Sequence, residues 1–254
     1  MRKRYLFFDY DGTLRSRSTD SVPKSAQDAI AALNDAGHFV ALATGRLQRN
    51  ALELAKPYGI TSLVADGGNS LTVDGKLVWI EGMPLGPCRA FLHWLDSEHL
   101  PWAVMVSNEL IRYTRRPDFT EYLPDTYMKT VVVPNLSVDE LDPIYKIFVP
   151  CAPGEERRFP FNGVTWARYS PLSIYCEPTD KSVGIRKMVE FFNADERDVV
   201  VFGDGSNDLS MFQPEWTSVA MGNAIGELKA RADLVTSDID EDGIWRACKQ
   251  LQLF

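Results

Sequence analysis

The sequence has no long apolar run and no excess of positive charge. The apolar stretch after the basic start Met1-Arg2-Lys3-Arg4 covers only Tyr5–Phe8 and ends at Asp9. Such a stretch is too short for a membrane helix or for the apolar region of a secretion signal. The 27 lysines and arginines are outnumbered by 35 aspartates and glutamates, which leaves a net charge of −8. Nucleic acids and anionic membranes are bound through clustered positive charge, so we expect neither as a partner.

Paired cysteines and paired histidines are also absent. The four cysteines are Cys88, Cys151, Cys176 and Cys248, and the three histidines are His38, His93 and His99. The cysteines form no C-x-x-C pair and no two histidines have a convincing ligand spacing, so the sequence suggests neither a zinc site nor a disulfide framework. We expect buried, reduced thiols and a cytoplasmic protein. The sequence contains no sign of the oligomeric state.

What is present is an alternation of strand and helix patterns that is interrupted once. Apolar runs typical of strands buried on both faces alternate with apolar residues at helical spacing. The expected strands are Tyr5–Phe8, His38–Ala43 and Ser62–Ala65, with helices over about Pro23–Ala36 and from about Leu47. Asp74-Gly75, between two short apolar runs, is a strong hairpin signal. After Pro178 the alternation returns, with a helix over Lys181–Phe192 and a strand at Val199–Phe202.

Residues 83–177 break this alternation. They contain an expected helix at their start, several strand patterns and a capping-box helix start at Ser137-Val138-Asp139-Glu140. The expected strands are 102–106, 110–113, 145–149, 164–168 and 172–176. The order of elements predicts an α/β fold in which residues 1–82 and 178–254 form a doubly wound parallel sheet. Residues 83–177 are expected to form an inserted α+β domain with its own sheet.

Acidic and hydroxyl side chains gather directly after the expected core strands. Asp9 and Asp11 follow the first strand, Thr44 follows the second, and Asp204 and Asp208 follow the strand near residue 200. Ligands of an open α/β sheet bind outside the carboxyl ends of its strands, so we expect these residues in one crevice. Carboxylates gathered at one place repel one another and need a cation. Hard oxygen ligands without nearby histidine or cysteine favour Mg2+, which also binds phosphate oxygens.

The segment Asp9-Tyr10-Asp11-Gly12-Thr13-Leu14 resembles the D-x-D-G-T-L signature of the haloacid dehalogenase superfamily. Three further motifs of that superfamily have counterparts in the expected order. They are Thr44-Gly45-Arg46, Lys181 within Pro178-Thr179-Asp180-Lys181, and Gly203-Asp204-Gly205-Ser206-Asn207-Asp208. The insertion resembles the α+β cap of the Cof-type, or class IIB, phosphatases, so the resemblance covers essentially the whole chain. It departs from the family pattern at Asp66-Gly67-Gly68-Asn69 and at Ser182, which lie outside the catalytic set.

The resemblance implies a Mg2+-dependent phosphatase for a small phosphorylated metabolite, such as a sugar phosphate or a phosphorylated cofactor, with the cap setting specificity. Asp9 would accept the phosphoryl group, and Asp11 would act first as general acid and then as general base. Thr44 and Lys181 would position the phosphoryl group and offset its charge. The remaining implied phosphate-binding residues are Gly12, Gly45, Arg46 and Asn207. The implied metal ligands are Asp9, the backbone carbonyl of Asp11, Asp204 and Asp208.

Other functions stay open at this point. A phosphotransferase or mutase of the same superfamily would pass the phosphoryl group to a sugar hydroxyl. A signalling receiver module also uses acidic residues, a phosphorylated aspartate, a threonine and a lysine, although the chain length and the insertion disfavour it. A catalytically silent, metal-binding regulatory protein is disfavoured by the complete motif set. Single motifs also have plainer interpretations, since Asp and Gly are ordinary turn residues and Arg46 could be the structural partner of an acid.

Overall fold

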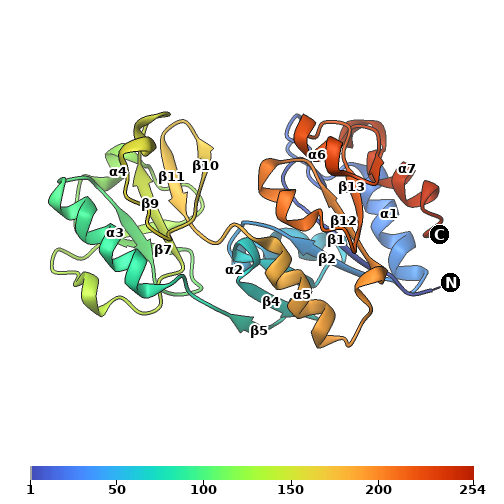
Figure 1. The fold of residues 1–254 in the computed structure, drawn as a ribbon, viewed down its shortest axis with the longest axis horizontal. Helices are drawn as coiled ribbons and strands as arrows, with labels where there is room; N and C mark the ends of the chain where they lie inside the picture. The colour runs from blue at the N-terminus through green and yellow to red at the C-terminus, as the bar shows by residue number, and fades with distance from the viewer. Residues whose placement is uncertain (1) are drawn as a thin grey trace. The chain divides into compact units, whose positions relative to one another are not determined.

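The computed structural model describes residues 2–254 and divides into two compact units (Figure 1). Residues up to Trp79 together with Asp180–Phe254 form the first unit, and Ile80–Thr179 form the second. The chain therefore leaves the first unit once and returns to it once. Within residues 2–254, no helix has the length and apolar character needed to cross a membrane. The four cysteines are buried and free.

An eight-stranded sheet forms the centre of the first unit. Six neighbouring strands run parallel, in the order β14 (Leu234–Val235), β13 (Thr217–Ala220), β12 (Val199–Gly203), β1 (Tyr5–Phe8), β2 (Phe39–Ala43) and β3 (Ser62–Ala65). β4 (Ser70–Val73) pairs antiparallel with β3, and β5 (Lys76–Ile80) forms the edge. From β1 the chain builds the sheet outward first on one side and later on the other, which confirms the doubly wound parallel sheet.

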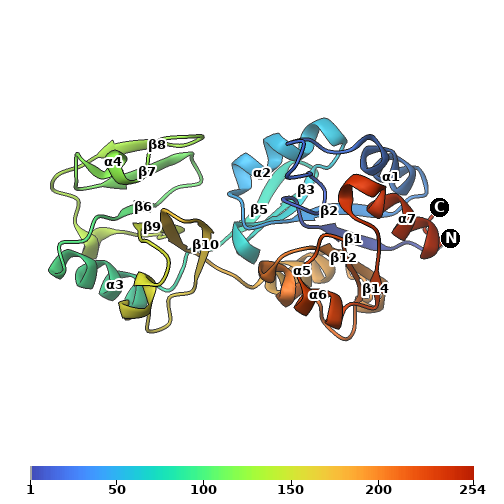
Figure 2. The same ribbon diagram turned by 90° about the horizontal axis from the view of Figure 1, so that it is seen from above.

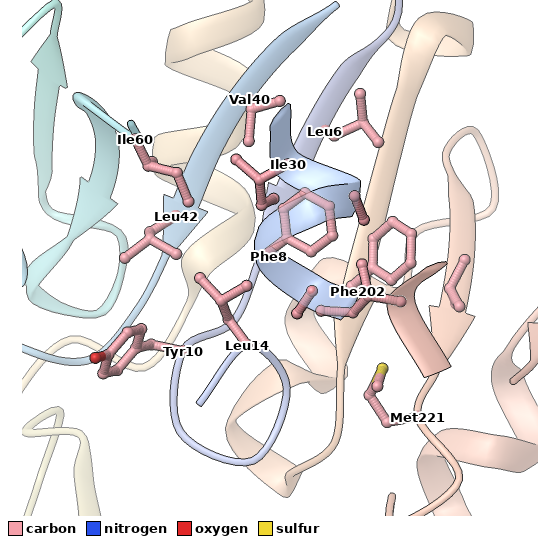
Figure 3. Packing of buried hydrophobic residues seen from close by; sticks show 14 of the residues in the cluster. Leu6, Phe8, Tyr10, Leu14, Ile30, Val40, Leu42, Ile60, Phe202 and Met221 are labelled. Atoms are coloured by element: carbon pink, nitrogen blue, oxygen red, sulfur yellow. The ribbon is translucent and has the colours of Figure 1, made fainter. Parts of the chain in front are cut away.

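Helices cover both faces of this sheet. They are α1 (Lys24–Asp35), α2 (Gln48–Ala55), α5 (Lys181–Phe191), α6 (Gly226–Arg231) and α7 (Gly243–Gln250). Successive strand residues point to opposite faces, so Phe8 packs in one cluster with Ile30 of α1 (Figure 3), whereas Phe7 packs in another with Ile185 of α5. Figure 2 shows α1 and α2 on one side of the sheet and α5 on the other. Both phenylalanines are fully buried, which explains the unbroken apolar run of β1.

The second unit contains a six-stranded sheet with the order β10, β11, β9, β6, β7, β8. Its strands are β6 (Ala103–Met105), β7 (Ile111–Thr114), β8 (Lys129–Val132), β9 (Lys146–Pro150), β10 (Trp166–Ser170) and β11 (Ser173–Cys176). Its helices are α3 (Leu85–Ser97) and α4 (Phe119–Tyr122). Neighbouring strands are antiparallel except for the parallel pair β7 and β8. Phe91 of α3 and Ile147 of β9 belong to a hydrophobic core of this unit alone.

Two details of the second unit differ from the sequence-based expectation. The capping-box pattern at Ser137 predicts a helix, but only the 3-10 turn Val138–Glu140 forms and the Ser137 side chain makes no capping hydrogen bond. The physical reason is Pro143, because a proline disfavours helical conformation in the residue before it. β8 was not predicted. Its residues lie at a sheet edge and none is fully buried, so they lack the apolar pattern of an interior strand.

Candidate active site

The carboxyl ends of three parallel strands bring the central predicted residues together. Asp9 follows β1, Thr44 follows β2 and Asp204 follows β12, and β1 pairs with both of the other strands. The backbone amide of Asp9 donates to the carbonyl oxygen of Phe202 at 3.0 Å, which extends the β1–β12 pairing to the site. All three site side chains belong to buried residues. Sheet topology alone therefore places a hydroxyl and two carboxylates at one edge.

A buried lysine joins two carboxylates at this edge. Lys181 Nζ lies 2.5 Å from Oδ1 of Asp9 and 2.6 Å from Oδ1 of Asp208, and all three side chains are almost completely shielded from solvent. Burial acts to lower the pKa of the Lys181 amine, but the charges and hydrogen bonds of Asp208 and Asp9 outweigh it and raise that pKa above its ordinary value. Lys181 is therefore charged and neutralises part of the local negative charge.

Lys181 reaches this position because α5 begins in very close contact with the loop that contains Gly68. Gly68 has φ of +111°, and a Cβ at this position would lie 2.1 Å from the carbonyl oxygen of Asp180. Glycine permits both this conformation and this approach. The Asp180 side chain caps α5 by accepting hydrogen bonds from the amide (3.0 Å) and hydroxyl (2.5 Å) of Ser182. Both departures from the family pattern thus lie where they help to position Lys181.

Hydrogen bonds from Thr13 and from two backbone amides hold the carboxylates of Asp204 and Asp208 in position. The Thr13 hydroxyl donates to Oδ1 of Asp204 at 3.1 Å. Oδ2 of Asp208 accepts from the backbone amides of Asp204 and Gly205, both at 2.9 Å. Gly12 has φ of +101°, and a Cβ there would lie 2.3 Å from Oδ2 of Asp204. The loop after β1 can therefore approach Asp204 only because residue 12 is glycine.

The carboxylates of Asp9, Asp204 and Asp208 form a group that fits a metal ion. One oxygen from each residue lies within 4.8 Å of the others, and all three residues are buried. Burial and then the charge of Asp208 raise the pKa of Asp9, and the same two causes raise the pKa of Asp204 to about 6. Three carboxylates face one lysine here, so the group has more negative charge than Lys181 balances. Hard oxygen donors with excess negative charge suit a divalent cation such as Mg2+.

Asp11 lies outside this group and is bound by two arginines. Arg46 donates from Nε to Oδ2 at 2.6 Å and from Nη2 to Oδ1 at 2.8 Å, and Arg15 donates from Nη1 to Oδ1 at 2.9 Å. Burial acts to raise the pKa of Asp11, but the hydrogen bonds and charges of Arg46 and Arg15 outweigh it and hold the pKa below its ordinary value. Asp11 is therefore ionised here. Arg46 is the structural partner of an acid, one of the two interpretations left open by the sequence.

The other predicted residues lie around the same strand ends. The hydroxyl oxygen of Thr44 accepts a hydrogen bond from the amide of Arg46 at 3.2 Å, and a hydroxyl that accepts in this way can still donate its own hydrogen. Gly45 is half-buried between these two residues. Asn207 places Nδ2 3.4 Å from Oδ1 of Asp208, which is a weak contact.

Sequence reasoning missed three residues of the loop that follows β1, namely Thr13, Arg15 and Arg17. Arg17 donates from Nη2 (2.5 Å) and Nε (3.1 Å) to the backbone oxygen of Asp11, and from Nη2 to Oδ2 of Asp204 at 3.1 Å. Thr13 lies inside the D-x-D-G-T-L segment, so the motif itself was a signal for it. The two arginines had no such signal, because arginines in polar loops are usually solvated.

Comparisons with known proteins agree with this architecture. The family model described as haloacid dehalogenase-like hydrolase matches residues 6–248. YkrA of Bacillus subtilis is 30% identical over 259 aligned residues, which cover 100% of this chain and 99% of YkrA. The crystal structure of a protein from Geobacillus kaustophilus HTA426 has a TM-score of 0.85 at 31% identity, with 100% of both chains covered. The subclass IIB sugar phosphatase BT4131 has a TM-score of 0.81 at 25% identity, covering 99% of this chain and 100% of its own.

Proposed function

This chain belongs to the haloacid dehalogenase-like hydrolases and is a phosphatase, and we propose that it hydrolyses a small phosphorylated metabolite with Mg2+ bound and with Asp9 as nucleophile. The observation that supports this most strongly is the convergence of Asp9, Lys181 and two further carboxylates at the end of β1. A structural ion pair would need one carboxylate for one lysine. The surplus carboxylates indicate a site for a cation and for an anion that the cation binds.

Asp9 accepts the phosphoryl group in this proposal. One carboxylate oxygen attacks phosphorus while the bond from phosphorus to the ester oxygen breaks, which leaves an acyl phosphate on Asp9 and an alkoxide. Water then attacks phosphorus, the bond to Asp9 breaks and the carboxylate returns. Lys181, 2.5 Å from Asp9, stays charged and offsets negative charge throughout. Mg2+ held by Asp9, the carbonyl oxygen of Asp11 and Asp204 would supply further positive charge to the phosphoryl oxygens.

Asp208 supports this arrangement by holding its neighbours in position, in addition to being a candidate metal ligand. Its Oδ1 accepts from Lys181 and its Oδ2 accepts from two backbone amides. A hydrogen-bonded carboxylate oxygen keeps a further lone pair, so Asp208 would contact Mg2+ either directly or through water. Its main role would be to hold Lys181 and the loop of Asp204 in place.

Asp11 is proposed as the acid that protonates the leaving alkoxide and as the base that takes a proton from water. The base role needs the ionised form, which Arg46 and Arg15 favour in this structure. The acid role needs the protonated form, so at least one arginine must leave Asp11 when substrate binds. Arg46 can exchange the carboxylate for a phosphate oxygen, since its guanidinium binds both anions through the same donors. Arg46 would then be both the structural partner of an acid and a phosphate-binding residue, the two interpretations that the sequence left open.

The likeness to the sugar phosphatase BT4131 supports a sugar phosphate as the first substrate class to test, with phosphorylated cofactors as the second. In this proposal the second unit, the predicted cap, selects the organic part of the substrate. The physical basis of the reaction lies in the first unit and does not depend on which substrate is found.

Phosphate release from a panel of sugar phosphates and phosphorylated cofactors tests the proposal, with Mg2+ present or removed by EDTA. Asp9→Asn should lower turnover at least about a thousandfold, because the amide is a far weaker nucleophile. Asp28→Asn is the control, since Asp28 is an acidic residue of the α1 surface that pairs with Lys24. Free phosphate formed without an acceptor sugar would exclude phosphoryl transfer to sugars as the main activity. Undiminished turnover by Asp9→Asn, or in EDTA, would contradict the proposal.

A further inference from the structure

Arg17 places a positive charge on two of the oxygen atoms that the proposed function assigns to Mg2+. Its guanidinium donates twice to the backbone oxygen of Asp11, from Nη2 at 2.5 Å and from Nε at 3.1 Å. Nη2 also donates to Oδ2 of Asp204 at 3.1 Å. A guanidinium and a metal ion use the same oxygen lone pairs, so they compete for these two acceptors.

The Arg17 side chain enters the site from solvent. It is 65% exposed, whereas the Asp204 side chain that it contacts is 7% exposed. The backbone beside it is held, because the amide of Ser16 donates to the carbonyl of Ser21 at 2.9 Å and the Ser18 hydroxyl donates to Asp240 at 2.7 Å. The side chain can therefore leave the site without a rearrangement of the loop. Only the arginine of this ion pair is exposed, so the pair contributes less free energy than a fully buried one would and a better cation can replace the guanidinium.

The loop after β1 also has room for the Arg17 side chain because residue 12 is glycine. A Cβ at Gly12 would lie 2.8 Å from Nε of Arg17 as well as 2.3 Å from Oδ2 of Asp204. Any other residue at position 12 would therefore displace the guanidinium or the carboxylate. Together with Lys181, Arg17 adds a second positive charge to a group of three buried carboxylates.

We propose that Arg17 is a built-in competitor of the metal ion. It binds the carbonyl oxygen of Asp11 and the carboxylate of Asp204 while the ion is absent, and it withdraws into solvent when the ion binds. This inference rests on the proposed function, because it takes these two oxygens as Mg2+ ligands. The Arg17 side chain stabilises the metal-free protein. The affinity of the protein for Mg2+ is therefore lower than it would be if the oxygen ligands had no competing partner.

The test compares the wild-type protein with Arg17→Gln and with the control Arg197→Gln. Arg197 is an exposed arginine that also pairs with an aspartate, Asp195, and it precedes the amino end of β12, whereas Asp204 follows the carboxyl end of that strand. Mg2+ binding is measured by calorimetry, and thermal unfolding is measured in EDTA and in saturating Mg2+. Arg17→Gln should bind Mg2+ about three- to tenfold more tightly, since one charged hydrogen-bonded competitor is removed. Its Tm in EDTA should be lower than that of the wild type, and saturating Mg2+ should raise its Tm by more than it raises the Tm of the wild type.

Arg17→Lys should give an intermediate Mg2+ affinity, because it keeps the charge and loses the forked donors. Arg197→Gln should bind Mg2+ as the wild type does. Equal affinity in the wild type and Arg17→Gln would overturn the role of Arg17 while leaving the magnesium site intact. Weaker binding by Arg17→Gln would also overturn it, because Arg17 would then assist the ion. No Mg2+ binding by any of these proteins would contradict the metal site itself, and this inference with it.

Discussion

Replacing Lys181 with methionine would leave two buried carboxylates without their shared counterion. Lys181 Nζ lies 2.5 Å from Asp9 and 2.6 Å from Asp208, and all three side chains are almost inaccessible to solvent. Removing one partner of a buried ion pair costs about 3–5 kcal/mol. For the metal-free Lys181→Met protein at about pH 8 we expect a loss of about 4 kcal/mol in the free energy of unfolding. For a domain of this size, that loss corresponds to a decrease of roughly 8–16 °C in Tm.

The loss should depend on pH in a defined direction. Burial raises the pKa of Asp9, and Lys181 opposes that increase, so the variant should have a still higher pKa for Asp9. A carboxyl whose pKa is higher in the folded than in the unfolded protein binds more protons when folded. Stability then falls as pH rises from the ordinary value of about 3.9 through the raised value. The wild type shows the same fall until its own raised Asp9 pKa of about 8, so the difference from the wild type should be nearly constant below about pH 7 and should grow above about pH 8.

Urea denaturation in EDTA at several pH values measures this difference. Lys187→Met is the matched control, because Lys187 is exposed on the same helix and lies over the Trp79 ring, 4.5 Å from its centroid. The free energy of unfolding of this control should fall by about 1 kcal/mol or less. A loss for Lys181→Met as small as the control's, or one that is equal at both ends of the pH range, would refute the reasoning.

Three further changes test other parts of the site. Gly68→Ala should lower the free energy of unfolding, measured by urea denaturation, by more than about 2 kcal/mol and should lower turnover, because the new Cβ would meet the Asp180 carbonyl. The control Gly75→Ala is also at positive φ but faces open space, so it should lower the free energy of unfolding by about 1 kcal/mol. Arg46→Ala should raise the pKa of Asp11, so the limb of the kcat/KM profile that reports Asp11 should move to higher pH, and an unchanged profile would exclude this coupling. Mg2+ affinity, measured by calorimetry, should fall as pH decreases, because protons compete for the proposed ligand Asp9 below about pH 8 and for Asp204 below about pH 6; a constant affinity would contradict this.

The core strands were predictable because they are buried on both faces. Tyr5–Phe8 and Ser62–Ala65 were predicted with the bounds that β1 and β3 have, since continuous apolar runs mark strands covered by helices on both sides. The second unit was less predictable. β8 lies at a sheet edge with a mixed burial pattern, and the capping-box pattern at Ser137 was overruled by the nearby Pro143.

The sequence by itself determined which chemical groups stand at the strand ends. The order of strands and helices requires a parallel sheet, and a parallel sheet collects the residues after its strands at one edge, so Asp9, Thr44 and Asp204 could be placed together without coordinates. Only the tertiary structure decided their partners. Lys181 reaches Asp9 and Asp208 through the close contact between α5 and Gly68, and the two arginines Arg46 and Arg17 reach Asp11 and Asp204. Such contacts depend on packing and side-chain conformation, which leave no periodic signal in a sequence.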